Sequence, residues 1–286
     1  MTGTGRPPGA PIRPAPSVPG PRWEVGGWPL SSYLAEAVGS AWLVLVALTA
    51  ISFTMHAGEG LSSWPLTARL AVVGASVGGS VALFSITPAG KESGGHLSPA
   101  VSLFMAVRGV LPARDLLAYA VSQLCGSVLG VFAARVLWGA RVGAVHDGLI
   151  QPGTGWSSTE VFCGEALSTA VLLWVLAGMT ARPRPRSTPW TVAAVIAALI
   201  TTTGAQTGAS FNPARNFGPH VVTGDYHLFW AYMAAPLAGA LLAAAALAPL
   251  RTTRPWTDKL CCERDVHRYH QLQLRFRHHH LPSSSR

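Results

Sequence analysis

Two short polar motifs, far apart in the chain, carry the residues best suited to contact a solute. One is Asn212-Pro213-Ala214, followed by Arg215, and the other is Ser98-Pro99-Ala100. Each begins with a polar residue that can cap a helix and continues with proline at the first helical position. A helix that begins in this way turns its free N–H groups and the positive end of its dipole toward whatever lies before it. Two such ends would offer hydrogen-bond donors to a neutral solute and would repel a cation.

The rest of the chain is apolar enough to place these motifs inside a membrane. Hydrophobic residues make up 49% of the sequence, charged residues only 12%, and the mean hydropathy is +0.34. Several uncharged runs approach the roughly 20 residues that cross a hydrocarbon core. We predict six transmembrane helices, at residues 31–53, 66–87, 113–138, 159–179, 188–205 and 227–248. The motif segments, 98–107 and 212–221, are too short to cross and must enter from opposite faces as half-helices.

The two halves of the chain also resemble one another outside the motifs. Glu36-Ala37 in the first span is followed by small and apolar residues at the same positions as Glu165-Ala166 in the fourth. Each half, 31–138 and 159–250, holds three spans, so the second copy is inverted in the membrane. Broken helices at matching places of an inverted repeat mark a solute path near the bilayer midplane. The sequence therefore predicts an all-α membrane protein with a central passage.

The distribution of basic residues predicts the orientation. The formal net charge is +9, but Lys and Arg gather in the tails and short loops, which argues against a nucleic-acid partner. With Arg215 set aside, 17 of them fall on the side of the termini and three on the other side. Short loops rich in Lys and Arg stay in the cytoplasm. We therefore expect both termini to be cytoplasmic, in a multi-pass protein of the cell membrane that contacts its lipids.

Both ends of the chain are predicted to lie outside the membrane domain. Residues 1–30 hold eight of the 22 prolines and no apolar run, which indicates a disordered tail rather than a signal peptide. Residues 251–286 form a basic tail with Cys261, Cys262 and several histidines. Their spacing fits no standard metal site, so we expect no metal and a solvated segment near anionic lipid.

Together these features resemble the aquaporins, the major intrinsic protein family, over about residues 31–250. The resemblance rests on the layout of six spans plus two half-helices, on Glu36 and Glu165, and on the long motif around Asn212. It implies an inverted two-fold bundle of six transmembrane helices and two re-entrant half-helices. It also implies a passive channel for water and small uncharged solutes that excludes ions and protons, has no cofactor or enzymatic activity, and forms a homotetramer.

The resemblance also assigns roles to the motif residues. In that family the two proline motifs, which we call the first and the second corner, face each other at the pore midplane. The resemblance therefore places Ser98, Pro99 and Ala100 of the first corner there, with Asn212, Pro213 and Ala214 of the second. Arg215 corresponds to the arginine of the outer constriction. When the spacing of the family is counted back from the two motifs without gaps, the other constriction positions fall on Gly78, Ile200 and Ala209.

Two departures from the family pattern concern selectivity. Ser98 replaces the asparagine of the first corner; it caps a helix equally well but is shorter and offers one donor instead of two. Small or aliphatic residues around Arg215 would make a wider, more apolar ring, which favours a facilitator of glycerol or another small neutral solute. Against this, the stretch 219–227 is short, and Asn216 replaces an aspartate common in glycerol facilitators. The sequence leaves water and glycerol both open.

Three further polar residues have competing interpretations. Intramembrane acids such as Glu36 and Glu165 can form a proton relay. Their matched positions, together with the resemblance to the family pattern, favour instead a structural role, in which they accept hydrogen bonds from the re-entrant loops. His96 precedes the first corner and is expected to line the cytoplasmic vestibule, either as a packed, hydrogen-bonded residue or as a pH gate.

Two other function classes remain as alternatives. An ion-coupled secondary transporter also uses inverted repeats and broken helices, but it needs acids that face the substrate. A membrane enzyme would need a metal, a nucleophile or a pair of acids that converge within the spans, and the sequence shows no such pattern. The paired corners with Arg215 favour a fixed pore.

Overall fold

The computed structural model describes residues 24–25, 28–56, 58, 60–180, 187–249 and 259–260. Most of the predicted tails, including the cysteines and histidines of 261–286, lies outside these residues. Within the predicted tail 1–30, β1 (Glu24–Val25) pairs antiparallel with β2 (Trp28–Pro29) directly before the first long helix.

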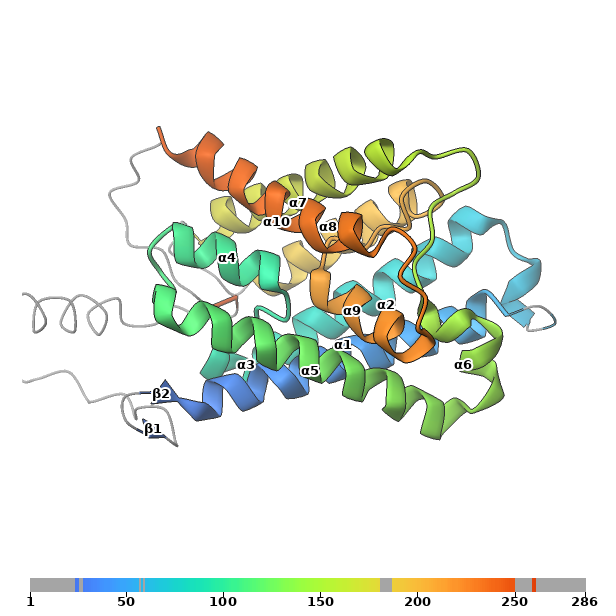
Figure 1. Cartoon of the computed structure of the whole chain (residues 1–286), viewed down its shortest axis with the longest axis horizontal. Coiled ribbons are helices and arrows are strands. Elements are labelled where there is room, and N and C mark those ends of the chain that lie inside the picture. Colours follow the sequence, from blue (N-terminus) through green and yellow to red (C-terminus); the bar gives the residue numbers. More distant parts are fainter. Residues whose placement is uncertain are drawn as a thin grey trace, which may run out of the picture.

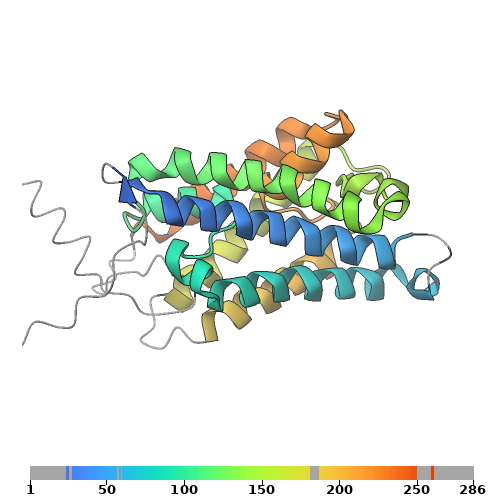
Figure 2. The same cartoon turned by 90° about the horizontal axis from the view of Figure 1, so that it is seen from below.

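Six long helices form the body of the described part (Figures 1 and 2). They are α1 (Leu30–Thr54), α2 (Leu66–Ile86), α5 (Ala113–Trp138), α7 (Ser158–Thr180), α8 (Thr188–Thr203) and α10 (Phe229–Leu247). Each begins and ends within two residues of a predicted span. All but α8 are long and apolar enough to cross a membrane, whereas α8 has 16 residues. The sequence prediction of six spans thus corresponds to five full-length helices and one short apolar helix.

Two short helices begin at the proline motifs. The first, α4 (Pro99–Val107), has nine residues, and the second, α9 (Pro213–Thr223), has 11. In each helix the proline is the first residue, where its missing N–H costs no hydrogen bond. Neither is long enough to cross a hydrocarbon core, as the sequence predicts.

The helices pack as an inverted repeat. In the first half α1 lies along α5, and in the second half α7 lies along α10, while α2 of one half packs against α8 of the other. Each half-helix lies against the third long helix of the opposite half: α4 against α10 and α9 against α5. These contacts tie the two halves together. Figure 2 shows α1 between α2 and α5.

Matching glycines allow the closest helix contacts. A Cβ added to Gly126 of α5 would lie 2.1 Å from the carbonyl oxygen of Ala37, and one added to Gly239 of α10 would lie 2.3 Å from that of Ala166. Small residues let backbones approach closely where no hydrophobic effect drives helices together. Ala37 and Ala166 directly follow the matched glutamates of α1 and α7, so these contacts fix the glutamates at equivalent depths.

Four shorter helical segments connect the long ones. They are η1 (Gly60–Ser63), α3 (Pro88–Ser93), α6 (Ala140–Ala144) and η2 (His146–Gly148). Of these, α3 leads from α2 to the first motif, and η2 lies beside α9. Neither was predicted from the sequence, and both contribute to the site.

Candidate functional site

A cavity of about 240 Å³ lies among α1, α2, α7 and α8, and both proline motifs contribute to its wall. Ser98 and Asn212 line it together, although they come from opposite halves of the chain. The remaining wall is mostly aliphatic and comes from the four long helices: Leu43, Ala47, Ile51, Leu70, Val73, Val77, Val81, Leu172, Leu176, Val192, Ile196 and Ile200. The fold therefore brings Ser98 and Asn212 to the wall of one cavity.

Each corner residue caps its own half-helix. The Ser98 hydroxyl accepts a hydrogen bond from the N–H of Ala100 at 3.3 Å, and the Asn212 side-chain oxygen accepts one from the N–H of Ala214 at 2.9 Å. A side-chain acceptor at this position satisfies an N–H group that the helix itself leaves free. Ser98 therefore caps α4 in the same way as Asn212 caps α9.

The two corners differ in what their side chains donate. Asn212 Nδ2 donates a hydrogen bond of 2.7 Å to the carbonyl oxygen of Leu97, in the segment that leads into the other corner. Leu97 and Phe211 precede the two corners and share a left-handed backbone, with φ of 53° and 54°. Ser98 has no amide with which to make the corresponding bond to Phe211. The repeat symmetry of the backbone is thus retained while the side-chain symmetry is lost.

Glu36 and Glu165 hold the loops that lead into the corners. The Glu36 carboxylate accepts hydrogen bonds from the N–H groups of His96 at 3.0 Å and Leu97 at 2.7 Å. The Glu165 carboxylate accepts them from Ser210 at 3.1 Å and Phe211 at 2.8 Å. These are the contacts predicted for a structural role. Both glutamates are fully buried, and their oxygens point at backbone donors.

A second set of matched contacts supports the same loops. On α5, the Tyr119 hydroxyl donates a hydrogen bond to Ser93 O at 2.8 Å, and on α10 the Tyr232 hydroxyl donates one to Thr207 O at 2.9 Å. Sequence reasoning missed this pair. The signal was available, because each tyrosine stands seven positions before the close-contact glycine of its helix, Gly126 or Gly239.

Gln123 is a support present in one half only. Its amide nitrogen donates to Glu36 Oε2 at 2.7 Å and to Ser102 Oγ at 3.0 Å. On the other side, Glu165 accepts instead from the hydroxyl of Thr207 at 2.7 Å. Each carboxylate thus has at least one side-chain donor in addition to its backbone donors.

Arg215 lines the cavity and is held by a neighbouring loop. Its Nη2 donates a hydrogen bond of 2.9 Å to the carbonyl oxygen of Gly148 in η2. Its Nη1 is buried and has no partner within the described part of the chain. A donor that is buried without a partner costs free energy, so this nitrogen is suited to bind a polar solute.

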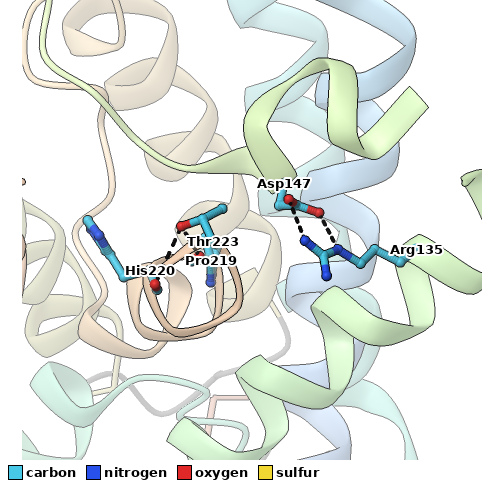
Figure 3. A network of polar contacts seen from close by, with 5 residues as sticks. All are labelled: Arg135, Asp147, Pro219, His220 and Thr223. Atoms are coloured by element: carbon cyan, nitrogen blue, oxygen red, sulfur yellow. Dashed lines mark hydrogen bonds and ion pairs between the residues drawn. The ribbon is translucent and has the colours of Figure 1, made fainter. Parts of the chain in front are cut away.

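The loop that holds Arg215 is itself fixed by an ion pair. Asp147, next to Gly148, accepts two hydrogen bonds from the guanidinium of Arg135 on α5, at 2.6 and 2.8 Å. Figure 3 shows this pair beside α9, where Thr223 donates a hydrogen bond to the carbonyl oxygen of Pro219. The paired geometry orients η2 and hence the carbonyl group that holds Arg215.

Two of the three side positions predicted around Arg215 lie in the cavity wall. Ile200 of α8 and Ala209 both line the cavity and are 7% and 5% exposed. Ala209 has a left-handed backbone with φ of 52°, in the segment held by Glu165.

The prediction that Gly78 lines the constriction is wrong. A Cβ added to Gly78 would lie 2.3 Å from the carbonyl oxygen of Ala193, so this face of α2 packs on α8. The residues that α2 presents to the cavity are Leu70, Val73, Val77 and Val81. Successive residues of an α-helix are turned by about 100°, which directs Gly78 toward α8 when Val77 faces the cavity. The ungapped count carried the family spacing across the turn at Thr87 and α3, and that spacing does not hold here.

Val73 and Val77, on either side of Gly74 along α2, line the cavity where Gly78 does not. A Cβ added to Gly74 would lie 3.2 Å from the Cβ of Ile200, so Gly74 and Ile200 are at the same level. Val73 is the cavity-lining residue of α2 beside Gly74. The wall at this level therefore carries a second branched aliphatic side chain.

His96, which the sequence assigns to the vestibule, lines the cavity two residues before Ser98. It is 3% exposed, and its Nδ1 lies 3.1 Å from the hydroxyl of Ser102 in α4. Its ring also lies 5.3 Å from that of Tyr119. These contacts favour the packed, hydrogen-bonded role over the pH gate.

Comparisons with known proteins agree with this geometry. The family model of the major intrinsic proteins matches residues 28–247. The chain is 31% identical to probable aquaporin NIP7-1 of Arabidopsis thaliana, over 75% of this chain and 74% of that protein. It is also 31% identical to aquaporin NIP1-1 of Zea mays, over 78% and 76% of the two chains.

A solved structure shares the fold. The X-ray structure of the aquaglyceroporin from Plasmodium falciparum superposes with a TM-score of 0.64 at 19% identity, covering 77% of this chain and 98% of that one. The six-plus-two architecture predicted from the sequence is confirmed by this likeness and by the family match. The chain therefore belongs to the major intrinsic protein family, whose members are membrane channels for water or small solutes.

Proposed function

We propose that this chain is a passive channel for water and for small uncharged solutes with a partly apolar surface, glycerol among them. The observation that carries the proposal is that Arg215 shares the wall of one cavity with aliphatic side chains, Ile200 and Val73 among them. A molecule with a carbon chain and hydroxyl groups can pack on such a wall while its hydroxyls bond to the guanidinium. Pores select by their diameter and by the donors and acceptors that line them.

The polar side of the path supports the same solute class. Asn212 and Ser98 line the cavity, and so do Gly208, Ala209, Ser210 and Arg215. The solute would thus meet polar groups on the side of the two motifs and aliphatic groups on the side of the long helices. Such a two-sided wall suits an amphipathic neutral molecule better than a fully hydrated ion.

Cation exclusion is proposed to come from Arg215 and the two half-helix ends. A fixed positive charge in a low-dielectric constriction opposes another cation strongly. The N-terminal ends of α4 and α9 add partial positive charges at the corners. Protons carried as hydronium would meet the same barrier.

Ion-coupled transport is disfavoured by the hydrogen bonds that the two buried glutamates accept. Glu36 and Glu165 are the carboxylates buried deepest beside the passage, and each accepts backbone N–H groups of a re-entrant loop. A coupling acid has to exchange a proton or face an ion, and these contacts tie both groups to the loops. We infer a fixed pore and no enzymatic role.

The membrane arrangement is also part of the proposal. We assign the channel to residues 31–250 and place both termini in the cytoplasm of a cell-membrane protein, because of the excess of Lys and Arg on that side. Leu117, Phe132 and Val136 of α5 are at least half exposed. These side chains would contact lipid or other copies in a homotetramer.

Flux measurements on proteoliposomes test the proposed solute class. Stopped-flow light scattering should show faster water movement than protein-free liposomes under a sucrose gradient and faster solute entry under a glycerol gradient, with urea as a second solute. An imposed proton gradient should change neither rate. Water movement without glycerol entry would leave a water-selective channel, and uphill glycerol entry driven by protons would establish a secondary transporter.

A further inference from the structure

A short stretch of chain beyond α10 returns to the channel. Lys259 and Leu260 are described apart from the rest of the C-terminal region, and they are 5% and 3% exposed. In Figure 1 they form the short red segment near α3. Two residues of a predicted solvated tail are thus buried against the channel domain.

The contacts of this stretch are to the backbone at the end of α3. The Lys259 ammonium donates a hydrogen bond to Glu92 O at 2.5 Å, and the Leu260 N–H donates one to Gly94 O at 3.2 Å. The last carbonyl groups of a helix lack partners within it, and a lysine near that end is favourable. Gly94 lies two residues before His96, so the stretch is bound to the segment that enters the first corner.

The Leu260 side chain lies in the wall of the cavity itself. It lines the cavity together with His96 and Leu97, and it belongs to the same cluster of buried apolar side chains as Leu97. The bond to Gly94 places it at the end of the cavity where α2 and α3 meet. Arg215 and Gly148 lie toward the other end, where α5 has ended and η2 follows.

We propose that Lys259 and Leu260 form an internal cap that restricts the His96 end of the channel and that leaves when the channel conducts fully. This inference rests on the channel function proposed above. An apolar side chain in a narrow passage removes the polar contacts that water needs and closes it by dewetting. No covalent change is required, because one leucine and two hydrogen bonds to main-chain oxygens make a reversible contact.

The attachment of the cap to α10 makes such a weak contact effective. Lys259 follows Ala248, the C-cap of α10, by a short length of chain. Tethering turns the binding of the cap into an intramolecular event at a high effective concentration. Loss of the leucine side chain would release the cap without altering the corners, the glutamates or Arg215.

The test compares water flux per folded channel in four proteins reconstituted at equal density. They are the full-length chain, Leu260→Ala, a chain that ends at Asp258, and the control Leu117→Ala. Leu117 is 73% exposed on α5 and lies outside the cavity wall. Truncating a buried leucine weakens its contacts strongly, so Leu260→Ala should raise osmotic water permeability by about threefold or more. The shortened chain should match it, and Leu117→Ala should match the full-length chain.

The possible results distinguish a failure of the cap proposal from a failure of the proposed channel function. Equal flux in the full-length chain, Leu260→Ala and the shortened chain, each above that of protein-free liposomes, would overturn the cap and leave the channel function intact. Lower flux in both altered chains, at equal amounts of folded protein by size-exclusion chromatography, would also overturn it. Flux no greater than that of protein-free liposomes in all four would overturn both proposals. A fifth protein, Lys259→Gln, lacks the ammonium that bonds to Glu92 O, and a partial rise in its flux would support the cap.

Discussion

The side-chain amide of Asn212 is hydrogen-bonded to the main-chain oxygen of Leu97 at 2.7 Å, so the second corner holds the backbone that leads into the first. The reverse bond, from Ser98 to the oxygen of Phe211, is absent from the hydrogen bonds of the described residues. The first corner is therefore held by Asn212 in addition to Glu36 and its own cap, whereas the second has Glu165 and its own cap without a bond from Ser98.

Substitutions of Asn212 should separate the effect of its capping hydrogen bond with Ala214 from that of its hydrogen bond to Leu97. Asn212→Ser keeps an acceptor for the Ala214 N–H and loses the bond to Leu97, whereas Asn212→Ala loses both. We expect each lost hydrogen bond to lower the free energy of unfolding by about 1 kcal/mol. Thermal unfolding in detergent should then rank the wild type above Asn212→Ser, and Asn212→Ser above Asn212→Ala. Equal midpoints for the two variants would show that the cap contributes nothing here.

The converse change, Ser98→Asn, should narrow the middle of the path. Asparagine keeps the cap and adds an amide that can reach toward Phe211 or a solute. We expect the ratio of water to glycerol permeability to rise while the barrier to cations is unchanged. Stopped-flow scattering gives the two permeabilities, and ammonium-driven pH changes in the liposomes report the cation barrier. A fall in the ratio would contradict the assignment of Ser98 to the midplane.

Removal of Arg215 should affect selectivity more than water flux. Arg215→Val takes a fixed positive charge and a donor out of the wall, so ammonium and larger polyols should enter faster. The matched control is Arg141→Val, because Arg141 packs over Phe53 outside the cavity wall. If both variants admit ammonium equally, Arg215 does not form the cation barrier.

The corrected position of Gly78 leads to a prediction about packing. Gly78→Val should reduce the yield of folded protein, because its side chain would meet the Ala193 backbone, and overpacking of this kind costs roughly 1–3 kcal/mol. The control is Gly79→Ala, since a Cβ at Gly79 would have no neighbour within 4 Å. Val73→Ala should instead fold normally and raise glycerol permeability. Normal folding of Gly78→Val with altered selectivity would restore the original assignment.

Mercurials can test the position of Ala209. Cysteine should adopt the left-handed backbone there at about the same cost as alanine, because both carry a Cβ. A thiolate that lines the cavity would hold a bulky metal in the path, so Ala209→Cys should be blocked by external mercury salts and recover with a thiol reductant. The wild type serves as the control, because Cys125 and Cys163 do not line the cavity. Equal inhibition of both proteins would place Ala209 outside the path.

The elements that could be predicted are those specified locally. Uncharged runs of sufficient length gave the long helices, and a capping residue before proline gave the starts of α4 and α9. The repeat identified Glu36 and Glu165 as matched residues, and the family resemblance added the expectation that they contact the loops. Each of these signals lies within one segment or in a comparison of two copies of it.

The features that could not be predicted depend on how a helix is rotated or on contacts between distant segments. The face that α2 turns to the cavity is not visible in the sequence, because small and apolar residues lie on every side of this helix, and Gly78 was misplaced for this reason. The pairing of Arg135 with Asp147, which fixes the loop that holds Arg215, depends on an unpredicted η2. The return of Leu260 to the cavity has no local signal at all.

The short length of α8 has a consequence for the surrounding bilayer. At 1.5 Å per residue, its 16 residues extend about 24 Å, less than the roughly 30 Å of a typical hydrocarbon core. Trp190 near its start is 52% exposed, so part of α8 faces outward. Lipid beside this helix must thin or bend to match it, at a cost of fractions of a kcal/mol for each ångström. The protein should therefore be solvated more favourably in membranes with shorter acyl chains, and the thinnest point of its lipid shell should follow α8.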